Sequence, residues 1–474
     1  MPFNSISFIV FFALFVLAYY CVDSKSLKLF FSLIGSYLFY TFGSVFNLLC
    51  LLLITVTSGF TINLLGKYRN KTVLVAGIGL IIAILLTAKY SENIFPLFSI
   101  NQSIDNRLFS FWGIPIGISF YSLQAISLLV DAYTNKYIFE FSWKKICLFL
   151  SFFPQALAGP IHRANELLPQ FESEKKFDSK KFIVGFKIML WGYFCKLIVA
   201  DKISLIITPV LDAYYKQDGL SLSLASILYS LQIYFDFWGY SLIAIGAGKL
   251  LGYSIKSNFD KPYSARSFRD FWHRWHITLS KWMKDYIYMP LGGRNKKSVL
   301  NYRTSIFVTF FISAFWHGTT ANFLLWGATH ATLYLAEDGI RSKFSRYKDS
   351  RFSKFFTQIV WPVVFFVCVT ITWLIFRTHD LHDLCAILSN IFDIGNWTAN
   401  NLKSHYLTSV NVVYLTVALC GILFVNSKSF KYFTTRTSST KRDIARDSFF
   451  LFACLVLIIL FGDIGSQTFI YFDF

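Results

Sequence analysis

The chain has 474 residues, of which 55% are hydrophobic and only 15% are charged, and its mean hydropathy is +0.51. This composition excludes an ordinary soluble globular domain. The formal net charge of +19 would suggest nucleic-acid binding in a soluble protein, but here the basic residues gather in loops between apolar segments. Cytoplasmic loops that face anionic lipid explain that pattern, so we expect no nucleic-acid partner.

The apolar segments predict a bundle of membrane-spanning helices. A helix needs about 20 apolar residues to cross the hydrocarbon core. Segments 145–161 and 304–316 are too short to cross alone, which predicts re-entrant or broken helices that pack against protein. We expect an all-α, polytopic transmembrane bundle with roughly eleven crossings. In chain order, the candidate spans are residues 5–22, 28–42, 44–65, 72–89, 109–130, 145–161, 182–207, 221–250, 304–316, 321–336, 356–376, 409–426 and 447–465.

The N-terminal segment is expected to be a span and not a cleavable signal, since no basic region precedes it and no small-residue cleavage site follows it. Lys25 and Lys28 follow this span, so the positive-inside rule places the N-terminus outside. Because no long polar stretch divides the chain, we predict a single membrane domain over residues 1–474. Its expected parts are scaffold helices (1–108), a catalytic core (109–340) and C-terminal helices (341–474).

Metal and nucleotide chemistry have no support in the sequence. The eight cysteines are dispersed and form no C-x-x-C pair, and we interpret them as packing residues. No Walker loop, G-x-G-x-x-G or H-E-x-x-H occurs, so we expect no metal and no bound cofactor.

Polar residues concentrate between Trp112 and Gly318, within otherwise apolar sequence. A charge at the centre of a membrane helix costs about 2.5–3.5 kcal/mol, so such residues usually mark function. Between Phe268 and Tyr286, large apolar residues recur at steps of three and four, which predicts one amphipathic helix, interfacial or lining a polar cavity. This half of the chain should hold the chemistry.

His317 is the strongest candidate for catalysis. It follows the apolar run 305–314 in the sequence Phe-Trp-His-Gly, where a low-dielectric surrounding keeps an imidazole neutral. A neutral imidazole can act as a general base on an alcohol; the alternative is a packing histidine. On spacing alone, we interpret His276 as an interfacial histidine and His162 as a structural residue.

Several sequence blocks, in chain order, carry a resemblance to a known family. They are 115–121, 152–155, 158–161 with Arg163, Lys196 with 200–201, 234–237 with 239–241, 258–293, 316–318 with 326–327, and 469–472. Together they resemble the membrane-bound O-acyltransferase family, in particular its bacterial branch that acetylates exported polysaccharides. Related sequences usually carry serine at the position of Trp238, an acidic residue at Leu242 and arginine at His273, which puts the polar network around Asp236 in doubt.

The resemblance implies that His317 is the catalytic histidine and that His276 is a second catalytic residue, both at a central tunnel through the membrane. Whether His317 acts as general base or carries the acetyl group itself stays open. The implied substrate-binding or tunnel-lining residues are Trp316, Asn322, Tyr263, Arg266, Trp275, Asp236, Gln155 and Tyr121.

The resemblance also implies the substrates and the location. The donor would be cytoplasmic acetyl-CoA, and the acceptor an exported cell-surface polysaccharide, alginate-like or peptidoglycan. A periplasmic or extracellular partner with a serine nucleophile would carry the acetyl group, and the enzyme would lie in the bacterial cytoplasmic (inner) membrane. The competing reading is a transporter or flippase for a lipid-linked sugar, which lacks the internal repeat of many transporters. A structural membrane subunit is a third alternative.

Overall fold

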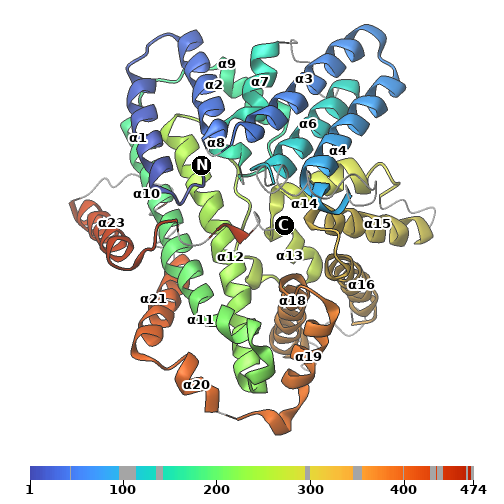
Figure 1. Ribbon diagram of the computed structural model, residues 1–474, viewed down its shortest axis with the longest axis vertical. Coiled ribbons are helices and arrows are strands. Elements are labelled where there is room, and N and C mark those ends of the chain that lie inside the picture. Colours follow the sequence, from blue (N-terminus) through green and yellow to red (C-terminus); the bar gives the residue numbers. More distant parts are fainter. Residues whose placement is uncertain are drawn as a thin grey trace, which may run out of the picture. The chain divides into compact units, whose positions relative to one another are not determined.

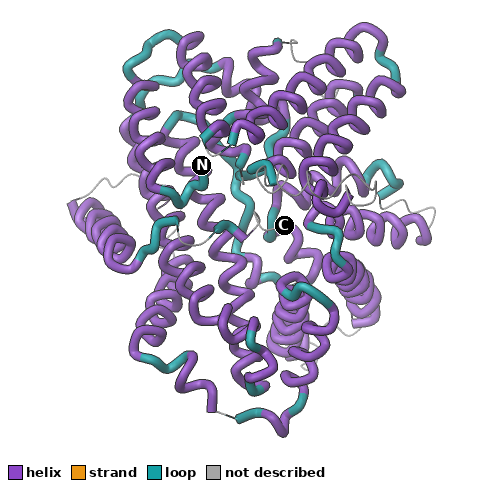
Figure 2. Tube along the Cα trace, viewed as in Figure 1, coloured by secondary structure: helices purple, strands orange, loops and turns teal. Residues whose placement is uncertain are grey.

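The computed structural model describes residues 1–42, 44–94, 114–134, 142–157, 159–293, 299–344, 355–398, 400–426, 434, 441–465 and 468–470. These residues form helices joined by loops, and they contain no β-strand (Figure 2). The predicted all-α class is therefore confirmed. Residues 109–113 of one predicted span, and Ala158, Tyr471 and Phe472 of the family-like blocks, lie outside the described residues.

The chain folds into two compact units. The first unit comprises Met1–Met189 and Tyr240–Lys256, and the second comprises Leu190–Gly239 and Ser257–Phe474. Two long helices, α10 (Ser179–Tyr193) and α12 (Gly219–Leu250), contribute to both units.

The first unit is a helical bundle in which α3, α4 and α6 pack side by side (Figure 1). Helix α2 packs against α3 and α7. The segment predicted at 145–161 is broken, as expected, because helix α7 ends at Ser151 and a four-residue helix follows. Besides parts of α10 and α12, the helices are α1 (Ile6–Tyr20), α2 (Lys25–Thr41), α3 (Val45–Tyr68), α4 (Lys71–Ile94), α6 (Ile118–Tyr133), α7 (Trp143–Ser151), α8 (Phe153–Ala156) and α9 (Ala164–Glu172).

The core of the first unit combines aromatic packing with internally satisfied hydroxyl groups. The ring of Phe153 lies 5.2 Å from that of Phe15 and 5.5 Å from that of Phe39. Buried hydroxyls donate to the carbonyl four residues earlier, as those of Ser36 and Ser58 do at 2.7 Å. Such bonds satisfy polar side chains where water is absent.

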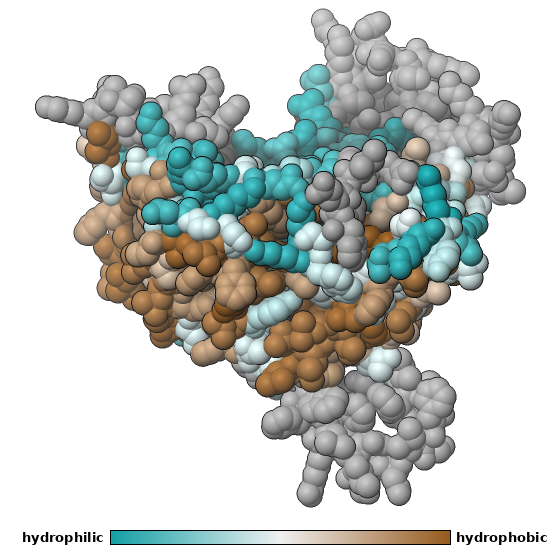
Figure 3. Space-filling view, turned by 90° about the horizontal axis from the view of Figure 1, so that it is seen from above, coloured by the Kyte–Doolittle hydropathy of each residue, from teal (hydrophilic) through white to brown (hydrophobic). Residues whose placement is uncertain are grey.

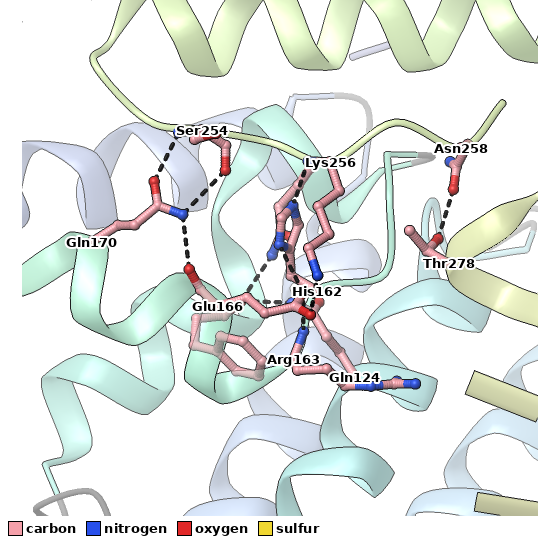
Figure 4. Close-up of polar contacts among 11 residues, drawn as sticks. Gln124, His162, Arg163, Glu166, Gln170, Ser254, Lys256, Asn258 and Thr278 are labelled. Atoms are coloured by element: carbon pink, nitrogen blue, oxygen red, sulfur yellow. Dashed lines mark hydrogen bonds and ion pairs between the residues drawn. The ribbon is translucent and has the colours of Figure 1, made fainter. Parts of the chain in front are cut away.

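A buried histidine fastens the loop after α12 within the first unit (Figure 4). The backbone N–H of Lys256 donates to Nε2 of His162 (3.3 Å), so the neutral ring carries its proton on Nδ1, which lies 3.4 Å from Glu166. Burial alone would raise the pKa of Glu166, but hydrogen bonds from His162, Lys256 and the Arg163 backbone lower it to about 2. These contacts confirm the structural interpretation of His162.

The second unit is organised around a pair of helices, α15 and α16, which pack against each other. Helix α16 also packs against α13 and α18, and α18 lies beside α16 in Figure 1. Gly327 permits the close approach of the pair, because a Cβ there would lie 2.8 Å from the carbonyl oxygen of Phe310. Helices α21 and α23 pack against a π-helical segment, η2.

The elements of the second unit, besides parts of α10 and α12, have these bounds: η2 (Phe194–Ala200), α11 (Asp201–Asp212), η3 (Tyr214–Lys216), η4 (Pro262–Ser264), α13 (Phe268–Arg274), α14 (Ile277–Met283), η5 (Lys284–Tyr288), α15 (Val299–His317), α16 (Ala321–Phe344), η7 (Phe356–Val360), α18 (Trp361–Arg377), α19 (Leu381–Phe392), η8 (Ile394–Asn396), α20 (Asn400–His405), α21 (Ser409–Asn426) and α23 (Lys441–Phe461).

Large apolar side chains lie exposed on the outer helix faces, as expected of surfaces that meet lipid. Leu17 and Ile459 are 66% and 77% exposed, and brown, apolar residues cover much of the face in Figure 3. Within the described part of the chain, six helices are long and apolar enough to cross a membrane, and three shorter helices are also apolar. The predicted eleven crossings are not confirmed by this measure.

Candidate active site

The segment around His276 differs from the sequence prediction. One amphipathic helix was predicted between Phe268 and Tyr286, and this is wrong, because the helix breaks at Trp275 and His276. The break is held by backbone hydrogen bonds to an extended segment: the N–H of Ile277 donates to the carbonyl of Asn258 (2.9 Å), and that of Asp260 donates to the carbonyl of Arg274 (3.0 Å). Tertiary pairing thus overrides the helical periodicity.

His276 occupies the break with a left-handed backbone (φ +40°). Its ring is buried, with a centroid 4.6 Å from that of Phe237 and 6.3 Å from that of Trp316. Burial lowers the pKa of His276 to about 3, so the imidazole is neutral at pH 7. His276 is thus buried at a helix break and not at the edge of one amphipathic helix, and its interfacial location stays a prediction.

His317 is the last residue of α15 and its side chain is buried. Its ring packs 4.8 Å from Trp316, 5.3 Å from Trp326 and 5.2 Å from Phe376, measured between centroids. Trp316 lies near both His317 and His276, so one indole links the two predicted catalytic histidines. Gly318 ends the helix where a Cβ would overlap the ring of Phe323.

A polar cavity of about 460 Å³ lies beyond two aromatic side chains that contact the His317 ring, and His317 itself is not among its lining residues. Phe323 and Phe376 line this cavity and also contact the His317 ring, at 6.5 Å and 5.2 Å. Its volume falls in the range of ligand sites, about 300–1,000 Å³. The remaining lining comes from η2, α11, α12, the turn before α16, the end of α18 with the turn after it, and the chain's last described residues, namely Lys196, Asp201, Ser204, Thr208, Tyr229, Gln232, Asp236, Thr320, Arg377, Thr378, His379, Thr468 and Ile470.

One wall of the polar cavity carries a buried group of three charges. The ammonium of Lys196 lies 2.7 Å from Asp201 and 2.6 Å from Asp236. Asp236 also accepts the backbone N–H of Ile470 (2.9 Å), and Lys196 donates to the carbonyl of Thr468 (3.1 Å). These three residues, called the ion triad below, give Asp236 a polar network although Trp238 replaces the family's usual serine.

The π-helix η2 explains how the ion triad forms on one face. In a π-helix, each N–H bonds to the carbonyl five residues earlier, and here the N–H of Asp201 bonds to the carbonyl of Lys196. Residues five apart therefore lie near each other, which brings Asp201 beside Lys196. π-Helical turns occur frequently at functional sites.

Three further predicted residues lie in the second unit, in different surroundings. Tyr263 is half-buried and lines a separate apolar cavity of about 230 Å³, and its hydroxyl donates to the carbonyl of Ser230. Trp275 is buried, 4.6 Å from Trp373 between centroids. Arg266 is exposed, and its backbone N–H donates to Asp270 (3.3 Å).

Asn322 has a positioning role next to the polar cavity. Its buried amide donates to the carbonyl and hydroxyl oxygens of Thr378 (2.7 and 2.9 Å) and to the carbonyl of Asp380 (3.2 Å). It thereby joins the start of α16 to the turn after α18, which carries part of the cavity lining.

Gln155 and Tyr121 lie in the first unit. Gln155 is buried and donates to the carbonyl of Phe149 (3.2 Å), and Tyr121 is buried against Tyr40, with 6.1 Å between ring centroids. The second unit brings together His317, Trp316 and His276, and it places Asp236 on the polar cavity. The second unit does not contain Gln155 or Tyr121.

Of the ion triad, only Asp236 was predicted as a site residue, although Lys196 and Asp201 belong to the family-like blocks. The two residues are five apart, a spacing that α-helical periodicity assigns to different faces. Their presence within an apolar segment was the available signal, because unpaired charges are rare there.

Comparisons with known proteins identify similar chains and a matching family model. The family model described as the membrane-bound O-acyltransferase family matches residues 138–377, a range that contains both histidines and the ion triad. Probable alginate O-acetylase AlgI of Pseudomonas syringae pv. tomato is 29% identical over 438 residues, which cover 91% of this chain and 82% of the relative.

Two other relatives act on different polymers. Peptidoglycan O-acetyltransferase of Helicobacter pylori is 30% identical over 406 residues, covering 76% of this chain and 75% of the relative. Teichoic acid D-alanyltransferase of Bacillus subtilis is 26% identical over 264 residues, covering 53% of this chain and 66% of the relative.

Proposed function

The chain belongs to the membrane-bound O-acyltransferase family, and from this premise we propose that it transfers acetyl groups from cytoplasmic acetyl-CoA for the O-acetylation of an exported cell-surface polysaccharide. The observation that carries the proposal is the buried His317, whose ring contacts two aromatic walls of the polar cavity. The names of the relatives, which cover alginate, peptidoglycan and teichoic acid, support a polysaccharide as the final acceptor.

In the proposed reaction, His317 takes the proton of an acceptor hydroxyl that reaches its ring from the polar cavity past Phe323 and Phe376. The hydroxyl oxygen attacks the thioester carbonyl, the carbon–sulfur bond breaks, and coenzyme A leaves as the thiol after protonation. A positioned general base contributes about 10²–10⁴ to such a rate. His276 and Trp316 are proposed to orient the donor, since Trp316 lies near both histidines.

The proposal extends to the membrane and the partner. We place the enzyme in the bacterial cytoplasmic membrane, with donor and acceptor reaching His317 from opposite sides through the predicted tunnel. A periplasmic or extracellular protein with a serine nucleophile would receive the acetyl group, or a sugar hydroxyl would receive it directly. The six long apolar helices support a multi-pass protein.

The test is thiol release from acetyl-CoA by the purified protein, followed with a colour reagent, together with acetylation of the polysaccharide in cells. The His317→Ala variant should remain folded, and both its thiol release and its polysaccharide acetylation should be lower by at least about 10²-fold. The matched control is His382→Ala, whose side chain is 85% exposed and which should retain activity. Normal acetylation in cells that carry His317→Ala would refute the proposal, and no thiol release by the native protein would favour a transporter.

A further inference from the structure

The ends of three apolar helices lie together in the first unit. Helix α1 ends at Tyr20, whose hydroxyl donates to the carbonyl of Leu250, the last residue of α12 (2.7 Å). The ring of Tyr20 also lies 5.2 Å from that of Phe177, just before α10 begins at Ser179. Because α10 begins and α12 ends a helical stretch long and apolar enough to span a membrane, this junction is where the chain meets the polar surface of the bilayer.

Three lysines surround the junction, and they are called the lysine cluster below: Lys175, Lys181 and Lys249. The side chain of Lys181 is 63% exposed, so the cluster is open to the surroundings. Burial and the nearby charge of Lys181 lower the pKa of Lys175, and the same charge repels the ammonium of Lys249. Like charges held close together raise the free energy of the protein unless an anion joins them.

The carboxylates near the lysine cluster do not balance its charge. Asp178 lies 3.7 Å from Lys181, but among the described residues no carboxylate lies within ion-pair distance of Lys175 or Lys249. The buried Lys28 adds a further positive charge, since its ammonium donates to the backbone carbonyl of Lys175 (2.7 Å). The two glutamates close in sequence pair with lysines outside the cluster, Glu172 with Lys145 and Glu174 with Lys176.

Exposed aromatic side chains continue from the lysine cluster along α10. Phe177 is 58% exposed, and its ring lies 5.4 Å from that of Phe182. Phe182 and Phe186 are four residues apart and therefore share one face of the helix, and Phe186 is 40% exposed. These three residues, called the aromatic row below, provide an apolar surface beside a positive one. That pairing suits an amphiphile with an anionic head and alkyl chains.

We propose that the lysine cluster and the aromatic row bind one anionic phospholipid, with its phosphate at the ammonium groups and an acyl chain along the three rings. The positive-inside rule places Lys25 and Lys28 on the cytoplasmic side, so the lipid comes from the cytoplasmic leaflet, where anionic lipids are found. The proposal does not depend on the proposed function, because every residue of this site belongs to the first unit and both candidate catalytic histidines belong to the second.

The experiment compares two lipids that differ in the charge of the head group. Purified protein in detergent is titrated with phosphatidylglycerol or phosphatidylcholine of identical acyl chains, and native mass spectrometry measures how much protein carries one lipid. We expect phosphatidylglycerol to bind at least about fivefold more tightly. Excess glycerol phosphate should not displace it, because this soluble anion has no acyl chain to contact the aromatic row.

Variants then assign the binding to the lysine cluster. Replacing all three of its lysines by glutamine should weaken phosphatidylglycerol binding by about tenfold or more. The single variant Lys181→Gln, whose native side chain is mostly exposed and which should therefore fold, should weaken it by about fivefold, whereas Lys181→Arg should bind as the native protein does. The thermal midpoint in detergent reports whether each variant is folded.

The matched control removes the same number of charges from another loop. Lys67, Arg69 and Lys71 lie between α3 and α4, and the predicted spans place this loop on the same side of the membrane as Lys25. Their joint replacement by glutamine should change phosphatidylglycerol binding by less than about twofold, because charges beyond a Debye length are screened.

Four results would overturn the proposal. One is equal affinity of the native protein for the two lipids, and another is native affinity in folded Lys181→Gln. A third is displacement by glycerol phosphate, which would identify a soluble phosphate as the ligand. The fourth is an equal loss of affinity in the two triple variants, which would mean that the lipid is attracted by the total charge of the loops and not by a site.

Discussion

Replacing Lys196 by methionine is expected to destabilise the protein by about 3–5 kcal/mol, because it removes the cation that two buried carboxylates share. At an effective dielectric constant of about 20, each contact, at 2.7 Å and 2.6 Å, contributes roughly 6 kcal/mol of attraction. These distances place the two carboxylate oxygens no more than about 5.3 Å apart, so without the ammonium the carboxylates either repel each other by roughly 3 kcal/mol or one of them takes up a proton, and both outcomes cost free energy.

Solvent does not screen this repulsion effectively, since the side chains of Lys196, Asp236 and Asp201 are only 1%, 4% and 5% exposed. The lost attraction is partly offset, because the ammonium no longer has to be removed from water. The expected net loss of stability, about 3–5 kcal/mol, is what remains of the lost attraction after this offset.

The assay is the free energy of unfolding in detergent micelles, measured with denaturant. The control is Lys202→Met, a neighbouring lysine whose ammonium lies 5.3 Å from the centroid of the Tyr414 ring, and which should cost about 1 kcal/mol or less. Combining Lys196→Met with Asp201→Asn and Asp236→Asn should restore more than half of the lost stability. A loss at Lys196 no larger than at Lys202, or no recovery in the triple variant, would refute the reasoning.

Two further predictions concern the backbone and a buried histidine. Because burial lowers the pKa of His276 from its ordinary value of about 6.5 to about 3, the stability that depends on the neutral ring is complete above pH 6.5 and is lost as the pH falls toward 3. Between pH 7 and 5 the free energy of unfolding should fall by about 2 kcal/mol. His276→Asn, whose side chain tolerates the left-handed backbone, should abolish this pH dependence. An equal pH dependence of the unfolding free energy in both proteins would contradict this prediction. Gly246→Ala should cost about 1–3 kcal/mol, because its Cβ would lie 2.6 Å from the backbone N of Met189 and 2.8 Å from the carbonyl oxygen of Gly185. Gly79→Ala, with no heavy atom within 4 Å, should be neutral or stabilise by up to about 1 kcal/mol; equal thermal midpoints for the two variants would contradict the packing argument.

Much of the helical order could be predicted from hydrophobic segments alone. The predicted spans 5–22, 44–65, 221–250 and 409–426 correspond to α1, α3, α12 and α21 within a few residues. These segments are long and apolar, so burial or contact with lipid determines their structure.

The site was less predictable, because it depends on contacts between distant residues. The helix break at His276 results from backbone bonds to Asn258 and Asp260, and nothing in the periodicity of 268–286 reveals them. The ion triad likewise requires a π-helical turn to bring Asp201 beside Lys196. In contrast, the burial of His317 among aromatic rings could be predicted from the apolar run before it, and its catalytic role stays a prediction.

The π-helical turn also limits how this part of the chain can change in length. Deleting a single residue between Lys196 and Asp201 would allow an ordinary α-helical turn to form. In that turn the two charged residues would be four apart and would still share one helix face, and the hydropathy of the segment would be unchanged. A one-residue insertion would instead place them six apart, a spacing that puts them on different faces of an α-helix. Such an insertion should therefore damage the ion triad more than the deletion.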